Sequence, residues 1–372
     1  MPSKIKNDMI DEEQVEDLDE AEEVIPFTYS ITAYGADYPV DSLVKRIEAK
    51  DIIVPRFSWE PIEDSKIVGF QRDYIWPRSK ADRFLESLLL GLPVPGIFLV
   101  KDPSGLFLVL DGHQRLFTLQ AYYQGIINEK EYRLERVQDR FENKSYKDLD
   151  TEDRRRLDDS IIHATIIRQD EPSDDQSSIY AIFERLNTGG INLQPQEIRV
   201  ALYHGDFVRV LKELNEEEIW RNLFGKKSKR LKDMELILRF FAFLYYAEQY
   251  RRPMKDFLNR YMASNRDLAR QSEEELRDIF MKTTSAILEG IGPSAFRPKR
   301  PVNAAVVDSL TTGIARRLKE KGDIKNISNL RTSFDKLLSD KKYLSAVEKA
   351  TSDEVNVTTR IASAVKIFMN VK

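Results

Sequence analysis

The chain has 372 residues, of which 41% are hydrophobic, a formal net charge of −4 and no cysteine. This length and apolar content can form one large core or two ordinary ones, and the lack of cysteine excludes disulfides, thiolate metal sites and a catalytic thiol. No apolar stretch approaches the length that crosses a bilayer, and the acidic N-terminus is unlike a secretion signal. We therefore expect a cytoplasmic protein that has no membrane partner.

The chain begins with an acidic arm, residues 1–27, that we expect to be disordered. Residues 8–23 carry ten Asp or Glu and no basic residue, and they have few apolar positions to offset the entropy cost of ordering. Because this arm holds more negative charge than the net charge of the whole chain, the rest of the chain is slightly basic. The arm either shields a phosphate-binding surface or only keeps the chain soluble.

Residues 28–205 mix helical and strand patterns, which predicts an α+β domain. Helical periodicity and terminal signals predict helices over residues 40–50, 79–91, 115–123, 151–159, 177–186 and 194–203. Apolar runs predict strands over residues 52–54, 97–100, 106–110 and 163–168, and the second and third of these form a hairpin. Residues 128–150 are charged and irregular, which indicates a loop-rich insertion.

Residues 206–372 are almost wholly helical in pattern, which predicts an all-helical C-terminal domain. The segment 234–249 is too apolar for a surface helix and should lie at the centre of a bundle. Three prolines between residues 293 and 301 indicate a break, and helices are expected near 302–321, 328–350 and 353–370.

The most informative motif is Asp111-Gly112-His113-Gln114-Arg115, at the junction between a predicted strand and a predicted helix. A glycine there lets the backbone pass close to a ligand, and the helix start offers unpaired N–H groups and a positive dipole end to an anion. Arg115 adds a planar, charged fork suited to phosphate. The motif indicates a phosphate cradle. The same pattern is also typical of a sharp turn in which Asp111 caps the following helix.

Two further clusters accompany this motif, at residues 70–76 and 183–190. Together the three resemble the N-terminal nucleotidase domain of GmrSD-type, modification-dependent restriction systems, a relative of the ParB/sulfiredoxin fold. The likeness runs from about residue 40 to about residue 205, and the family usually has glutamine where this chain has His113. The resemblance implies a ParB/sulfiredoxin-like fold for residues 28–205, with a nucleoside triphosphate as ligand and Mg²⁺ as a candidate cofactor.

The resemblance also implies roles for individual residues. The expected nucleotide-binding residues are Gln71, Arg72, Gly112, Gln114, Arg115 and Asn187. The expected catalytic residues are Asp111, His113 and Gln71, with Asp111 also the metal ligand, because a carboxylate can hold a cation that bridges phosphates or can position the attacking water.

Structural roles remain open for several of these residues. Arg72 could pair with a carboxylate, and His113 could act as a general base or only as a hydrogen-bonding replacement for glutamine. The loop at Asn187 could simply follow a helix end, Trp76 is expected in the core, and Glu197 could reach a metal or an arginine.

The sequence lacks two familiar catalytic signatures. No Gly-x-x-x-x-Gly-Lys-Ser/Thr pattern occurs, so nucleotide hydrolysis would need a cradle other than a P-loop. The histidines are His113, His163 and His204, so residues 205–372 lack the histidine that a His-Asn-His nuclease requires. We expect structural roles for His163, in a strand, and for His204, at a helix end.

Four basic clusters make contact with the DNA backbone an expectation. They lie at residues 154–156, 226–230, 297–300 and 316–317. The leading hypothesis is a nucleotide-binding, NTP-hydrolysing module of a bacterial anti-phage or restriction-type defence system. It senses or regulates DNA, and DNA cleavage is either supplied by a separate effector nuclease or absent. The alternatives are a non-hydrolysing, nucleotide-gated DNA-binding protein and a scaffold that has lost nucleotide binding. A homo-oligomer is compatible with each of the three.

Overall fold

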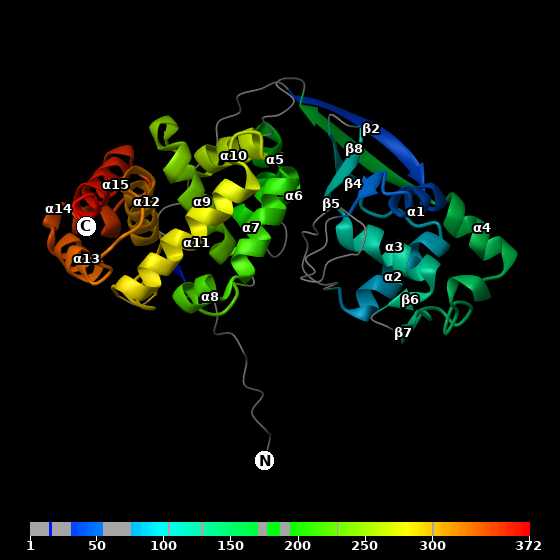
Figure 1. Cartoon of the computed structure of the whole chain (residues 1–372). Helices are drawn as coiled ribbons and strands as arrows, with labels where there is room; N and C mark the ends of the chain where they lie inside the picture. Colours follow the sequence, from blue (N-terminus) through cyan, green and yellow to red (C-terminus); the bar gives the residue numbers. More distant parts are fainter. Residues whose placement is uncertain are drawn as a thin grey trace, which may run out of the picture. The chain divides into compact units, whose positions relative to one another are not determined.

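The computed structural model describes residues 15–16, 31–54, 76–102, 105–127, 130–169, 177–186, 194–228, 230–299 and 301–372. The chain divides into two compact units, Pro26–Leu193 and Gln194–Lys372, and the second unit also includes Met1–Ile25. The first unit combines a sheet with helices, and the second is built from helices (Figure 1). This confirms the predicted α+β class with a helical C-terminal region.

A mixed five-stranded sheet organises the first unit, in the order β2-β8-β4-β5-β3. Its outer strand pair β2/β8 and its inner pair β4/β5 are antiparallel, whereas β8/β4 and β5/β3 are parallel. The strands, in sheet order, are Ile31–Pro39, Ile161–Gln169, Ile97–Lys101, Phe107–Asp111 and Ile52–Ile53. The predicted hairpin of β4 and β5 is therefore confirmed.

Strand β2 is the long strand of this sheet that the sequence did not predict. Its residues are largely exposed or half-buried along its whole length, so the alternation of apolar and polar side chains that marks a half-buried strand is absent. Its pairing with β8 over nine residue pairs defines it as a strand.

Four predicted helices of the first unit are confirmed, and they pack against one another. They are α1 (Val40–Glu48), α2 (Arg78–Leu89), α3 (His113–Gln124) and α4 (Thr151–Asp159). Leu43, Leu85, Leu116 and Val109 are among the core residues that they bury with the strands. Trp76 packs edge-on against Phe84, with ring centroids 5.8 Å apart, which confirms its expected place in the core. Helix α5 (Ser177–Leu186) contacts β5 and β8.

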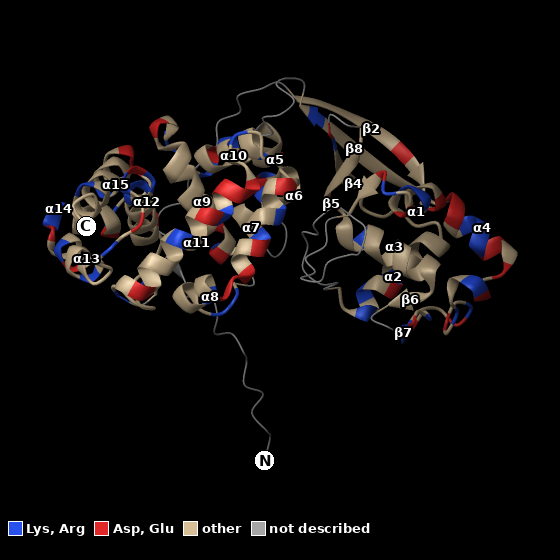
Figure 2. Ribbon diagram, viewed as in Figure 1, with Lys and Arg blue, Asp and Glu red and all other residues tan. Residues whose placement is uncertain are grey.

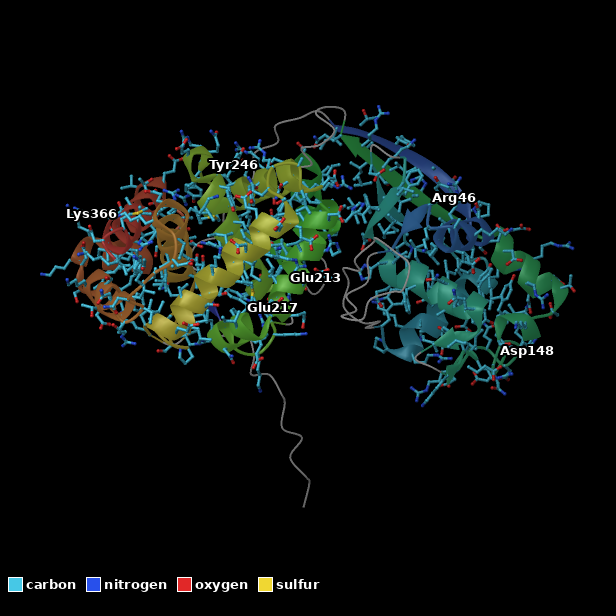
Figure 3. The ribbon with its side chains drawn as sticks, in the orientation of Figure 1. Arg46, Asp148, Glu213, Glu217, Tyr246 and Lys366 are labelled. Atoms are coloured by element: carbon cyan, nitrogen blue, oxygen red, sulfur yellow. The ribbon has the colours of Figure 1, made fainter. Side chains whose placement is uncertain are left out.

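The segment predicted as a loop-rich insertion is irregular but contributes to this core. Among its described residues it contains only β7 (Lys130–Glu131) and the 3₁₀ turn η1 (Tyr146–Asp148), and β7 pairs with β6 (Ile126–Ile127) just before the segment. Tyr132, Leu134 and Phe141 are nevertheless fully buried. Asp148, labelled in Figure 3, pairs with Arg133 at 2.9 Å and closes the η1 turn. Buried apolar side chains and local polar contacts together hold a segment that lacks regular structure.

The second unit is a bundle of helices around α9 (Lys232–Tyr245). Every residue from Leu236 to Leu244 is buried, and α9 packs against α6, α7, α10 and α12, so the predicted central helix is confirmed. The surrounding helices are α6 (Pro195–Leu202), α7 (Asp206–Glu216), α8 (Glu218–Phe224), α10 (Met254–Asn265), α11 (Glu273–Gly290), α12 (Ala304–Lys321), α13 (Asn329–Ser339), α14 (Lys341–Glu348) and α15 (Glu354–Phe368), with the 3₁₀ turn η3 (Ala247–Gln249) after α9.

The single helix expected over residues 328–350 is wrong, because the chain forms α13 and α14 with a break at Asp340. The Asp340 carboxylate accepts hydrogen bonds from the backbone N–H groups of Lys342 (2.8 Å) and Tyr343 (3.3 Å). Asp340 is thus the N-cap of α14, and a capping aspartate favours a new helix start over a continuous helix.

The domain limits differ slightly between sequence pattern and structure. The pattern changes near residue 205, whereas the compact units divide between Leu193 and Gln194, so α6 belongs to the helical unit. Within the acidic arm, Val15–Glu16 form strand β1, which pairs in parallel with β9 (Val302–Asn303). The other arm residues lie outside the described residues, and their disorder stays a prediction. No described helix is both long and apolar enough to cross a bilayer.

Candidate functional site

The corner between β5 and α3 contains a bulge that re-aims Asp111. Leu99 pairs with Val109, but the next pair along β4 is Phe98 with Asp111, so Leu110 is the extra residue. Because side chains alternate between the two faces of a strand, one extra residue turns Asp111 to the face opposite Val109. Val109 is part of the core, whereas the Asp111 side chain is 49% exposed. The bulge therefore presents this carboxylate to solvent.

Gly112 is required at this corner for two independent reasons. Its φ of 96° and ψ of 6° lie in the left-handed region, which residues other than glycine rarely adopt. A Cβ atom on Gly112 would also lie 2.4 Å from Cγ2 of Ile97. Gly112 is the N-cap of α3, and its carbonyl accepts the Leu116 N–H at 3.0 Å. The alternative in which Asp111 caps this helix is wrong, since no side chain caps α3.

Arg115 lies on the first turn of α3 and is held by two contacts. Its NH2 group donates to Asp111 Oδ2 at 2.7 Å and to the Gly96 carbonyl at 2.9 Å. The side chain is 13% exposed, and its buried Nε has no partner among the described residues. The guanidinium is thus fixed beside Gly112 and neutralised by a half-exposed carboxylate. An anionic ligand at the start of α3 would meet it directly and would compete with Asp111.

His113 is the first residue of α3, and its imidazole is neutral at pH 7. Burial lowers the pKa of His113 to about 4, the Asp111 carboxylate opposes this shift, and the Arg115 cation adds to it. Its Nδ1 is buried and has no partner among the described residues. A neutral imidazole with so low a pKa is a weak proton acceptor but a competent hydrogen-bonding group, which is how a glutamine would act at this position.

Gln114 links the corner to the preceding segment of the chain. Its Oε1 accepts the backbone N–H of Trp76 at 3.2 Å. Trp76 is the first described residue after Gln71 and Arg72, which lie outside the described residues together with Asn187. Four of the expected site residues therefore meet at the β5–α3 corner: Asp111, Gly112, His113 and Arg115, with Gln114 facing Trp76. The positions of the other three stay predictions.

Glu197 lies in the helical unit. A metal ion or an arginine was expected beside it, and it contacts an arginine. Its carboxylate accepts the Gln194 backbone N–H at 2.5 Å and pairs with Arg230 at 3.2 Å. The described residues contain no group of three or more side chains suited to hold a metal ion. Glu197 thus caps α6 and forms a buried ion pair.

Two of the basic clusters owe part of their charge to structural arginines. Arg317 is buried and donates to the backbone carbonyls of Val371 and Gly322, so it cannot reach a DNA phosphate. Arg297 donates to the carbonyls of Leu223 and Phe224 at the end of α8. Cations bound to helix-end carbonyls stabilise the bundle.

The other clusters retain exposed cations. Arg155 and Arg156 on α4 are exposed, although Arg156 pairs with Glu152 at 3.1 Å. Lys226 is exposed, and its neighbour Lys227 pairs with Glu216. Figure 2 shows both signs of charge along α4 and along the bundle helices. Fewer cations of the basic clusters are therefore available to contact DNA than the sequence suggested.

A histidine–carboxylate pair on the sheet was not predicted from the sequence. His163 on β8 pairs with Asp37 on β2, with Nδ1 and Oδ1 2.8 Å apart, and both side chains are more than half exposed. The expected structural role for His163 is not supported by this exposed position. The pair was missed because it depends on β2, whose pattern does not predict a strand.

The comparison with protein families places this corner in a known domain. Residues 47–204 match the family model described as "GmrSD restriction endonuclease, N-terminal domain". No curated protein and no solved structure matches the chain at a significant level. The match covers the β5–α3 corner and includes the segments of Gln71, Arg72 and Asn187. Residues 47–204 of this chain are therefore similar to the N-terminal domain of GmrSD-type restriction endonucleases.

Proposed function

We propose that the β5–α3 corner binds a nucleoside triphosphate and that this chain is a nucleotide-dependent module of a restriction-type defence system. The observation that carries the proposal is the Arg115 guanidinium, held within hydrogen-bonding distance of the Gly96 carbonyl and of Asp111 at the start of α3. Helix N-termini attract phosphate through their free N–H groups and dipole, and a fixed arginine adds a charge-assisted contact.

The Asp111–Arg115 ion pair suits a ligand that brings both signs of charge. A triphosphate with Mg²⁺ offers anionic oxygens to Arg115 and a cation to Asp111, so each partner of the pair exchanges one opposite charge for another. Mg²⁺ binds through one or two carboxylates together with substrate phosphates, so a single half-exposed carboxylate fits that ion. When bound there, Mg²⁺ would neutralise charge on the phosphates.

The proposed activity is slow NTP hydrolysis. His113, which replaces the usual glutamine of the family, is too weak a proton acceptor at pH 7 to activate water. This favours the non-hydrolysing, nucleotide-gated DNA-binding protein as the second candidate. In both cases the chain senses or regulates DNA, and a separate effector nuclease cuts it. Exposed cations such as Arg155, Arg156 and Lys226 are the proposed DNA contacts.

Calorimetric titration of the full chain with ATP, GTP, CTP and UTP, each with and without Mg²⁺, tests the binding step. We expect micromolar or tighter binding of at least one nucleotide in Mg²⁺, and the absence of heat with all four would contradict the proposal. Phosphate release at saturating nucleotide then separates hydrolysis from simple gating.

Plasmid nicking tests the proposed division of labour. Supercoiled DNA, plain and base-modified, is incubated with the chain, Mg²⁺ or Mn²⁺ and the bound nucleotide. We expect no cleavage. Robust nicking that disappears in a single-carboxylate variant would mean that this chain is itself the nuclease.

A further inference from the structure

Phe98 on β4 lies directly beside the Asp111 carboxylate of the nucleotide corner. The two residues pair across the β4–β5 ladder, and directly paired residues have Cβ atoms about 4.5–5.5 Å apart on the same face of the sheet. Ile97 and Leu99, the neighbours of Phe98 on β4, belong to the core. Because side chains alternate along a strand, Phe98 is directed to the opposite face, where the Asp111 side chain is 49% exposed. An aromatic ring therefore lies next to the proposed phosphate site.

The Phe98 ring is half-buried, and it is in none of the aromatic pairs of the described residues. Phe107, on the neighbouring strand β5, is also half-buried, but its ring packs on the core, with the Lys101 ammonium 5.9 Å from the ring centroid. Single apolar side chains are common on protein surfaces, so exposure alone assigns no role to Phe98. Its position beside a candidate ligand group separates it from Phe107.

The row of side chains that continues from Phe98 contains one small polar neighbour. Thr165 on β8 pairs with Phe98, and Gly35 on β2 pairs with Thr165. The position over Gly35 is filled, because a Cβ atom there would lie 2.7 Å from Cε1 of His163. Among the described residues, the accessible part of this row is therefore a phenyl ring followed by a hydroxyl group, and the His163 imidazole bounds it.

The phosphate-binding groups and the Phe98 ring are separated by a distance that one nucleotide spans. The Gly96 carbonyl accepts the Arg115 NH2 group at 2.9 Å, and Asp111 accepts the same group at 2.7 Å. Gly96 lies two residues before Phe98, which corresponds to about 6–7 Å along a strand. A ribose joins phosphate to base over a distance of this order. A triphosphate held at the start of α3 can thus place its base over Phe98.

We propose that Phe98 is the platform on which the base of the bound nucleoside triphosphate stacks. The proposal rests on the proposed nucleotide site, in which Arg115 and the start of α3 hold the phosphates. Every nucleobase has a π-face, so an aromatic platform accepts all four bases with modest preferences. The Thr165 hydroxyl, which both donates and accepts hydrogen bonds, is the neighbouring group that meets the edge of the base. Phe98 thus supplies affinity for the base, a part that inorganic triphosphate lacks.

The test separates the base from the phosphates by comparing two kinds of ligand on the full chain. Calorimetry in Mg²⁺ gives the Kd for ATP, GTP, CTP and UTP and for inorganic triphosphate. An aromatic stacking partner contributes roughly 5- to 150-fold in affinity per base, so Phe98→Ala should raise the Kd of the nucleotides that bind at least fivefold. Its Kd for inorganic triphosphate should equal that of the unsubstituted chain. Arg115→Ala should weaken the binding of both kinds of ligand.

Two conservative substitutions control for folding. Phe98→Leu keeps an apolar side chain but removes the π-face, so its nucleotide Kd should lie between those of the unsubstituted chain and Phe98→Ala. Phe107→Leu makes the same change on the core face of the neighbouring strand and should leave nucleotide affinity unchanged. The melting temperature shows whether each variant is folded. Where Phe98→Ala does not fold, Phe98→Leu gives the same comparison.

Phe98→Trp gives a direct readout of stacking that needs no measurable affinity for inorganic triphosphate. This variant keeps an aromatic face and adds a fluorescent indole. Contact with a stacked base quenches indole fluorescence, so the nucleotides that bind should quench Phe98→Trp more strongly than the unsubstituted chain. Inorganic triphosphate should leave the fluorescence of this variant unchanged.

Each outcome decides between the two proposals. If no nucleotide binds to the unsubstituted chain, the nucleotide site and the role of Phe98 both fail. If a nucleotide binds and Phe98→Ala keeps the same Kd, the site stands and the stacking role is wrong. Equal losses of affinity for nucleotide and for inorganic triphosphate in a folded Phe98 variant would also overturn the stacking role. So would nucleotide binding to Phe98→Trp without additional quenching.

Discussion

Two arginine–aspartate clusters, one in each unit, use the same chemistry for different purposes. In the helical unit, Asp308 accepts two hydrogen bonds from Arg239 (2.9 and 2.8 Å) and one from Arg360 (2.9 Å), and all three side chains are at most 5% exposed. In the sheet unit, Asp111 pairs with Arg115 at 2.7 Å but is 49% exposed. The buried cluster cannot exchange its partners for a ligand, whereas the half-exposed pair can. Burial, rather than residue type, separates a structural ion pair from a candidate binding site.

The largest effect on the free energy of unfolding is expected for a substitution in the buried Asp308 cluster. Asp308→Asn removes the carboxylate charge that Arg239 and Arg360 share in the buried cluster, and breaking a buried pair in this way costs about 3–5 kcal/mol. The free energy of unfolding from denaturant titration should fall by that amount. The matched control is Asp335→Asn, whose exposed pair with Arg331 should contribute less than about 1 kcal/mol. Equal losses in the two variants would remove the contrast between buried and exposed pairs.

At the corner, the main effect should be on binding rather than on stability. Arg115→Ala removes a charge-assisted phosphate contact worth about 1.5–3 kcal/mol, so the nucleotide Kd should rise at least tenfold while the protein stays folded. Arg115→Lys keeps the charge but loses the planar fork, so its nucleotide Kd should lie between those of the unsubstituted chain and Arg115→Ala. Arg83→Ala, an exposed arginine on α2, is the control. Unchanged affinity in Arg115→Ala would rule out the cradle.

His113 should make stability depend on pH. Because burial lowers its folded-state pKa to about 4 from the ordinary 6.5, the unfolded chain binds a proton first as the pH falls. Above pH 6.5, His113 therefore does not lower the free energy of unfolding. Between pH 6.5 and about 4 it lowers this free energy progressively, by an amount of order 1–3 kcal/mol. His113→Gln should flatten this part of the pH profile of unfolding. A profile identical to that of the unsubstituted chain would mean that the imidazole is not held neutral.

A smaller effect is expected when the carboxylate of the corner is neutralised. Asp111→Asn frees Arg115 from a half-exposed ion pair, which is worth up to about 1 kcal/mol. Nucleotide affinity measured in EDTA should therefore rise up to roughly fivefold, whereas the gain that Mg²⁺ brings in the unsubstituted chain should disappear. If Mg²⁺ strengthens binding equally in both proteins, Asp111 does not hold the ion.

The smallest effect on stability is expected from the acidic arm. Deleting residues 1–23 removes strand β1, a pairing of only two residues with β9, so the melting temperature should change little. If the basic body binds DNA, the deletion should strengthen that binding at low salt and have less effect at high salt. A large drop in melting temperature would show that the arm is an essential part of the helical unit.

The success of prediction differed between elements for physical reasons. The helices α1 to α4, the β4/β5 hairpin and the apolar helix α9 were predictable because each has a strong local pattern or clear terminal residues. Strand β2 was not, because its side chains are exposed and only the pairing with β8 defines it. The α13–α14 break was missed since a helical pattern runs through Asp340, whose capping role depends on backbone geometry.

The sequence by itself determined that a glycine and an arginine stand at a strand-to-helix junction, because that motif and the elements around it are local. Only the tertiary structure decided what surrounds them. The bulge at Leu110 turns Asp111 outward, the Gly96 carbonyl fixes Arg115, and the pairing of β2 with β8 brings Asp37 to His163 across 126 positions of the chain. Contacts between distant segments depend on the packing of the whole unit, and a local pattern carries no record of them.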